Sequence, residues 1–152
     1  MIAVSIGLMT GDAHAAMPHP LTVGLRTIEI ACVVEGRDSE TNRSFEVAFC
    51  EELSRRVGEK LGVAVVRMDD AGPAVDRSLP RAATAWIRSA VRLDAEAAIA
   101  RTSWGSHMPQ RGVPPIEEGP PVSLRLEGST IAADGRALAG AVVAKLPFMP
   151  NE

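Results

Sequence analysis

The spacing of apolar residues changes from every second to every fourth position along the first half of the chain. Residues 26–34 alternate apolar and polar side chains, with β-branched residues at the apolar positions, which predicts a strand. Residues 44–61 place an apolar side chain at every fourth position, which predicts a helix with one buried face. Gly62 follows, where a left-handed C-cap favours glycine. The polar stretch before the helix offers three N-capping side chains, those of Thr41, Asn42 and Ser44.

The second half of the chain has mainly the strand period. Residues 97–104 fit a helix by their alanines and the returning strand of a hairpin by their position, and we predict the strand. Asp134 is the predicted N-cap of a closing helix, which Pro147 ends. Three further apolar or alternating segments each predict a strand: 63–68, 83–93 and 122–127.

The order of these elements, β-α-β-β-β-β-α, predicts the α+β fold class. We expect a two-layer sandwich, in which a mainly antiparallel sheet of about five strands carries two helices on one face. Antiparallel sheets can leave their other face in water. The predicted single domain covers residues 26–147, after a mobile N-terminal segment at 16–25 and before a tail at 148–152.

The first part of the chain, 1–15, has the pattern of a cleaved signal peptide. A short apolar run ends in alanines on both sides of His14, so we expect cleavage after Ala15 and a periplasmic or secreted protein. The run is shorter than the roughly 20 residues that span a bilayer, so we expect no transmembrane segment in the mature chain. No basic residue precedes Arg26, which a start codon further upstream would explain. The alternative interpretation makes residues 3–8 a buried strand.

The chain has two cysteines, and their interpretation depends on the compartment. Cysteines commonly pair in an oxidising compartment and stay reduced in the cytosol. Cys32 lies on the apolar face of the first predicted strand, and Cys50 lies on the apolar side of the first helix. We therefore predict a disulfide between Cys32 and Cys50, with two unpaired core thiols as the alternative.

Composition and charge argue against several classes of partner. The formal net charge is -3, without the concentrated basic face that nucleic acid requires, so we expect no nucleic-acid partner. Aromatic residues make up 3% of the chain and tyrosine is absent, which leaves few stacking platforms for sugars or nucleobases.

Side chains for metal or acid-base chemistry are few and scattered along the sequence. His14 leaves with the predicted signal peptide, and His19 lies in the segment expected to be mobile. Because no ligand spacing is recognisable, we predict neither a metal nor a cofactor. We also predict no catalytic residues, although Asp69, Asp70 and His107 could supply acid-base groups to a small exported enzyme.

Two surfaces could contact a partner. Trp86, Arg88 and Arg92 share the polar face of the predicted strand at 83–93, and Trp and Arg are the residues that most often anchor interfaces. The alternative is that the chain itself covers Trp86.

The long proline-rich segment at 105–121 is the second of these surfaces, because long loops are often functional or disordered. Its contact residues, with the residue before it, would be Trp104, His107 and Arg111. The sequence favours a small, exported, non-catalytic binding or envelope accessory domain with an envelope protein as partner, and the exported enzyme is the alternative.

Overall fold

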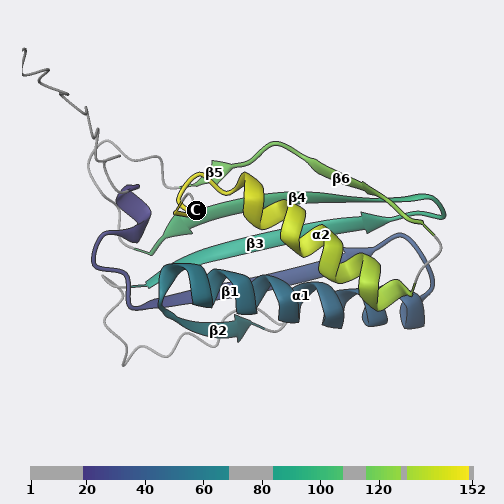
Figure 1. The fold of residues 1–152 in the computed structure, drawn as a ribbon, viewed down its shortest axis with the longest axis horizontal. Coiled ribbons are helices and arrows are strands. Elements are labelled where there is room, and N and C mark those ends of the chain that lie inside the picture. Colours follow the sequence, from purple (N-terminus) through teal and green to yellow (C-terminus); the bar gives the residue numbers. More distant parts are fainter. Residues whose placement is uncertain (1–18, 69–83, 108–115, 128–129, 151–152) are drawn as a thin grey trace, which may run out of the picture.

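A computed structural model describes residues 19–68, 84–107, 116–127 and 130–150. In these ranges one sheet forms one layer and two helices form the other, as expected of the α+β sandwich (Figure 1). The elements are a 3-10 turn (Pro20–Thr22), β1 (Thr27–Glu35), α1 (Ser39–Leu61), β2 (Ala64–Met68), β3 (Thr84–Leu93), β4 (Ala97–Ser106), β5 (Glu117–Glu118), β6 (Val122–Arg125) and α2 (Ile131–Lys145).

The sheet is mixed, with β1 between two parallel neighbours. Its strand order is β2-β1-β3-β4-β5, and β6 also pairs with β4, so the described residues contribute six strands. Strand β1 runs parallel to both β2 and β3, and α1 is the crossover connection between β1 and β2. The pairings of β4 with β3, β5 and β6 are antiparallel. Residues 97–104, for which a helix was the alternative prediction, lie in strand β4, so the predicted strand is confirmed. Strand β5 is short and was not predicted from the sequence.

Helix α1 begins five residues before the predicted start at residue 44, since its first residue is Ser39. Asp38 is the N-cap, and its carboxylate accepts a hydrogen bond from the backbone N–H of Thr41 at 2.8 Å. The three predicted caps therefore lie inside the helix. The C-cap was predicted correctly: Gly62 has φ of 63°, in the left-handed region.

Helix α2 also begins earlier than predicted. Thr130 is its N-cap and accepts a hydrogen bond from the backbone N–H of Ala133, whereas the predicted cap, Asp134, is a buried residue of the first turn. The helix ends before Pro147, as predicted, and its C-cap is Leu146. Both helices lie on the same face of the sheet (Figure 1).

The hydrophobic core lies between the sheet and the helices. Alternate residues of β1 and β3 point toward the helices, and Phe45 and Phe49 of α1 are fully buried against them. The predicted disulfide is present in this core: Cys32 of β1 and Cys50 of α1 are bonded, with Cα atoms 6.0 Å apart. The bond joins the two layers directly.

Parts of both terminal segments pack on the core. Leu21, in the segment expected to be mobile, is 7% exposed, and the ring of His19 lies 5.8 Å from that of Phe148. Phe148, in the expected tail, is buried and meets the ring of Trp104 edge-on at 5.6 Å. The predicted signal peptide lies outside the described residues.

Candidate functional site

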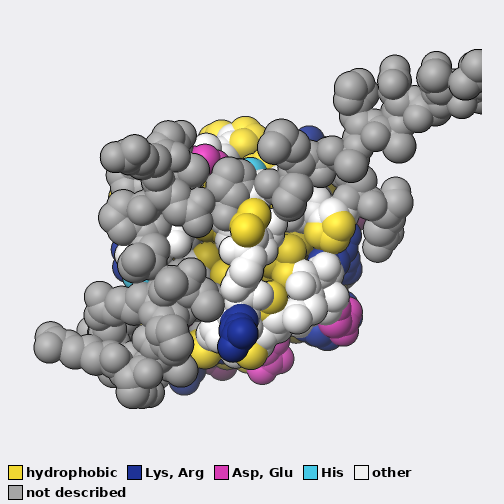
Figure 2. Space-filling model, turned by 90° about the vertical axis from the view of Figure 1, so that its left-hand side faces the viewer, with side chains coloured by type: hydrophobic (Ala, Val, Ile, Leu, Met, Phe, Trp, Pro, Cys, Tyr) yellow, Lys and Arg dark blue, Asp and Glu magenta, His cyan; other side chains and the backbone are white. Residues whose placement is uncertain are grey.

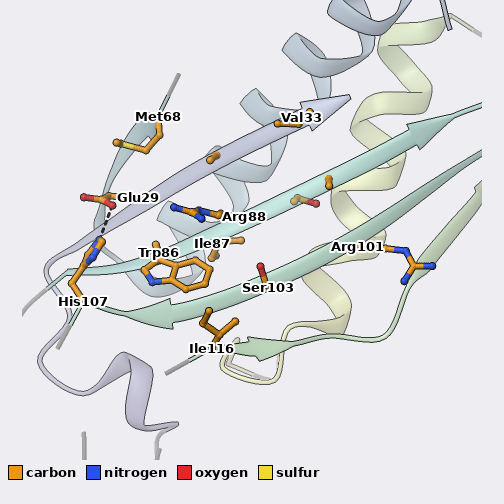
Figure 3. Close-up of a pocket in the computed structure, with 13 residues that line it drawn as sticks. Glu29, Val33, Met68, Trp86, Ile87, Arg88, Arg101, Ser103, His107 and Ile116 are labelled. Carbon is orange, nitrogen blue, oxygen red and sulfur yellow. Dashed lines mark hydrogen bonds and ion pairs between the residues drawn. The ribbon is translucent and has the colours of Figure 1, made fainter. Parts of the chain in front are cut away.

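The face of the sheet opposite the helices is hollowed into a groove with a volume of ≈ 580 Å³ (Figure 3). Residues of β1 to β4 line it, together with His107 and Ile116, which flank the undescribed segment 108–115. We call this hollow the open-face groove. Figure 2 views the molecule from the end of the sheet where β1 begins. On that side, the visible acidic and basic side chains are scattered around apolar ones and are not gathered by sign.

Small side chains beside large ones create the hollow. Ala31 of β1 and Ser103 of β4 flank Arg88 of β3 in the register of the sheet. Ala90, two residues further along β3, faces the same way, because side chains alternate between the two faces of a strand. These three small residues leave room above the sheet, which the longer side chains around them border.

An acid-base pair lies at one end of the groove. The carboxylate oxygen Oε2 of Glu29 lies 2.7 Å from Nε2 of His107, which brings together residues 78 positions apart. Their side chains are 23% and 27% exposed. Glu29 comes from β1, and His107 is the residue that follows β4, so the pairing of β1, β3 and β4 brings them together.

Beside this pair, a guanidinium group lies against an indole ring. The Cζ atom of Arg88 is 5.2 Å from the ring centroid of Trp86, a distance at which cation–π attraction operates. Arg88 is exposed, and Figure 3 shows it on the same side of the sheet as Glu29 and Trp86. Within the described ranges no carboxylate forms an ion pair with Arg88, since Glu29 binds His107 instead.

Of the three interface residues predicted from the strand period, two line the groove and one does not. Trp86 and Arg88 line the open-face groove, and Trp86 is half-buried within it. Arg92 is exposed on the same face of β3 but lies beyond the groove. Alternation along one strand could identify the shared face but not where on that face the hollow ends.

The three residues of the predicted loop surface do not form one surface in the structure. Trp104 lies in β4 on the helix-covered side and is 4% exposed, so its ring belongs to the core and not to a contact surface. Its indole N–H donates a hydrogen bond to Glu117 of β5. His107 lines the groove, and Arg111 lies outside the described residues.

Of the three residues considered as acid-base groups of an enzyme, only His107 lies within the described ranges. Asp69 and Asp70 lie outside the described residues, and His107 pairs with Glu29. Sequence reasoning missed Glu29, although the first strand's alternation places it on the polar face. In the described part of the chain, no group of three or more His, Cys, Asp or Glu side chains could hold a metal ion.

None of the helices within the described ranges is both long and apolar enough to cross a membrane.

Comparison with known proteins gives a likeness of fold. No protein-family model matches the chain, and no curated protein matches it. The PelC dodecamer from Paraburkholderia phytofirmans superposes with a TM-score of 0.51 and 14% identity, over 81% of this chain and 89% of that one. A variant PelC dodecamer from the same organism has a TM-score of 0.47 and 13% identity, over 84% and 90% of the two chains. A homolog of a neuraminyllactose-binding hemagglutinin from Helicobacter pylori has a TM-score of 0.37 and 11% identity, over 78% and 79%. At 14% identity, the superposition on PelC shows similarity of fold alone.

Proposed function

We propose that this protein is an exported, non-catalytic binding domain of the cell envelope, which holds a partner protein in its open-face groove. The observation that carries the proposal is the position of Trp86 and Arg88 in a hollow on the sheet face that the helices leave uncovered. Binding sites are typically concave and combine apolar walls with a few charged groups, and Trp and Arg are the most frequent anchors of interfaces.

The disulfide supports the exported part of the proposal. Cysteine pairs form and persist in oxidising compartments such as the periplasm, and Cys32–Cys50 is such a pair. The signal-peptide pattern at 1–15 indicates the same compartment. The likeness to PelC supports the fold on which the groove is built.

The experiment compares two valines on opposite faces of the molecule. Val33 borders the groove and is 37% exposed, whereas Val47 lies on α1 and is 44% exposed. A photo-reactive benzophenone amino acid is placed at one position or the other in the native host, and cross-linked products are identified by mass spectrometry. We expect an envelope protein to cross-link through position 33 and not through position 47.

The control variant removes the two anchors. Trp86→Ala combined with Arg88→Ala should abolish the cross-link from position 33 while the variant still unfolds in one cooperative thermal transition, since neither side chain belongs to the core between the sheet and the helices. Equal cross-linking from positions 33 and 47, or none from position 33, would contradict the proposed use of the groove.

A further inference from the structure

Two arginines line the open-face groove without an acidic partner in the described ranges, Arg88 and Arg101, and Arg88 is the one that lies against an indole ring. Glu29 is its diagonal neighbour: Glu29 pairs with Trp86 in register, and Arg88 pairs with the next residue of β1 on the same face, Ala31. Diagonal neighbours lie roughly 7–8 Å apart, within reach of long side chains. The carboxylate of Glu29 nevertheless binds His107, at 2.7 Å. His107 thereby leaves the guanidinium of Arg88 available.

The stacking on Trp86 orients the guanidinium for a particular kind of ligand. The indole lies against Arg88 at 5.2 Å and restricts a side chain that would otherwise sample many rotamers. No described residue accepts a hydrogen bond from the N–H groups of this guanidinium, so they remain free to bind a ligand. Those groups match a carboxylate with two parallel hydrogen bonds, which is a geometry that lysine cannot reproduce.

The surroundings of Arg88 favour an extended peptide over a small free anion. The groove follows β3 from Trp86 to Ala90, a distance of about 13 Å at the usual rise of a strand, which is the length of about four extended residues. Val33, Met68 and Ile116 add apolar side chains to its lining. An extended segment points every second side chain to the same side, so one acidic residue could reach Arg88 while the residues two positions before and after it contact these apolar groups.

We propose that Arg88, held on Trp86, binds the carboxylate of an acidic side chain in an extended segment of the partner protein. The inference rests on the proposed function, because it names the chemistry of the partner that the groove would hold. Charge complementarity carries it: the groove is lined by two arginines without an acidic partner in the described ranges, Arg88 and Arg101, and a histidine already occupies the carboxylate beside Arg88.

The test uses two synthetic peptides with blocked ends: one has a central glutamate with valine two positions to either side and serine between them, and its twin has glutamine in place of the glutamate. Binding to the full mature chain is measured by isothermal titration calorimetry. We expect the glutamate peptide to bind at least tenfold more tightly than its twin. Arg88→Ala should remove this preference, whereas Arg92→Ala, on the same face of the same strand but outside the groove, should keep it.

A second pair of variants tests the role of the histidine. His107→Ala frees Glu29 to compete for Arg88, so binding of the glutamate peptide should weaken severalfold. Adding Glu29→Gln to His107→Ala should restore it, because the competing carboxylate is then gone. A merely structural role for His107 predicts no such rescue, and circular dichroism shows whether each variant is folded.

Several outcomes would overturn the inference. They are equal affinity for the two peptides, no saturable binding at millimolar concentrations, equal loss in the Arg88 and Arg92 variants, and Arg88-dependent binding to phosphatidylglycerol vesicles without binding to the peptide. If cross-linking from position 33 persists while the glutamate peptide fails to bind, the proposed function stands and only the acidic-segment inference is wrong. Absence of that cross-link would instead contradict the proposed function itself.

Discussion

At the scale of the residue, the start of α1 depends on one carboxylate. Asp38 accepts hydrogen bonds from the backbone N–H of Thr41 at 2.8 Å and from its hydroxyl at 2.7 Å, and these bonds lower the pKa of Asp38 below its ordinary value of 3.8. A carboxyl group with a lowered folded-state pKa stabilises the fold above its unfolded pKa, and this contribution disappears as pH falls through the folded pKa. Asp38→Ala should therefore lower the urea midpoint at neutral pH, and the deficit should shrink in acid.

Asp38→Asn is the matched control for this prediction. Asparagine is a comparable N-cap but does not titrate, so its urea midpoint should lie near that of the wild type and should lack the acid-dependent change of the cap. A deficit of Asp38→Ala that stays constant from neutral pH to below 3.8 would contradict the titrating cap.

At the scale of the element, the two helices meet at a glycine. A Cβ atom at Gly135 of α2 would lie 3.0 Å from the carbonyl oxygen of Phe45 and 3.1 Å from the backbone nitrogen of Phe49, both in α1. Those atoms belong to the backbone of α1 and can move away only together with the helix, and overpacking of this kind costs about 1–3 kcal/mol. At Gly140, further along α2, the nearest atom is Cζ of Arg56, which belongs to a flexible side chain.

Alanine at the two positions should therefore have different effects. Both substitutions gain about 1 kcal/mol of helix propensity, but only Gly135→Ala forces the helices apart. We expect Gly135→Ala to have a free energy of unfolding about 1–3 kcal/mol below that of Gly140→Ala, measured by urea denaturation. Equal stability of the two variants would show that the helix contact can relax around an added methyl group.

At the scale of the whole molecule, the disulfide between Cys32 and Cys50 joins the sheet to the helical layer across 18 positions of sequence. Closing a loop of this length stabilises a fold by about 3 kcal/mol in the chain-entropy model. Replacing both cysteines by alanine should therefore lower the free energy of unfolding by about 3 kcal/mol, measured by urea denaturation.

The thiol count checks the same bond independently. With no free cysteine in the structure, denatured and unreduced wild-type protein should react with no thiol reagent, whereas Cys32→Ala should expose the thiol of Cys50. Two reactive thiols in the wild type would show that the bond does not form in the expressed protein.

The sequence was most informative where structure is local. The period of apolar residues located β1, β3, β4 and both helices, and it placed Trp86 and Arg88 on one face, because side-chain direction within a strand follows from the alternation of the backbone. It did less well at the helix starts. Several polar residues before α1 could accept a backbone hydrogen bond, and the path of the chain from β1 into the helix selects Asp38.

The sequence by itself determined which residues share a face of their own element, including the two cysteines that meet in the core. Only the tertiary structure decided which elements are neighbours, and the candidate site depends on that choice. The pairing of β1 with β3 and of β3 with β4 brings Glu29 to His107, frees Arg88 and buries Trp104 on the helix-covered side. The physical reason is that alternation is a property of each strand alone, whereas register and strand order depend on packing between residues distant in sequence.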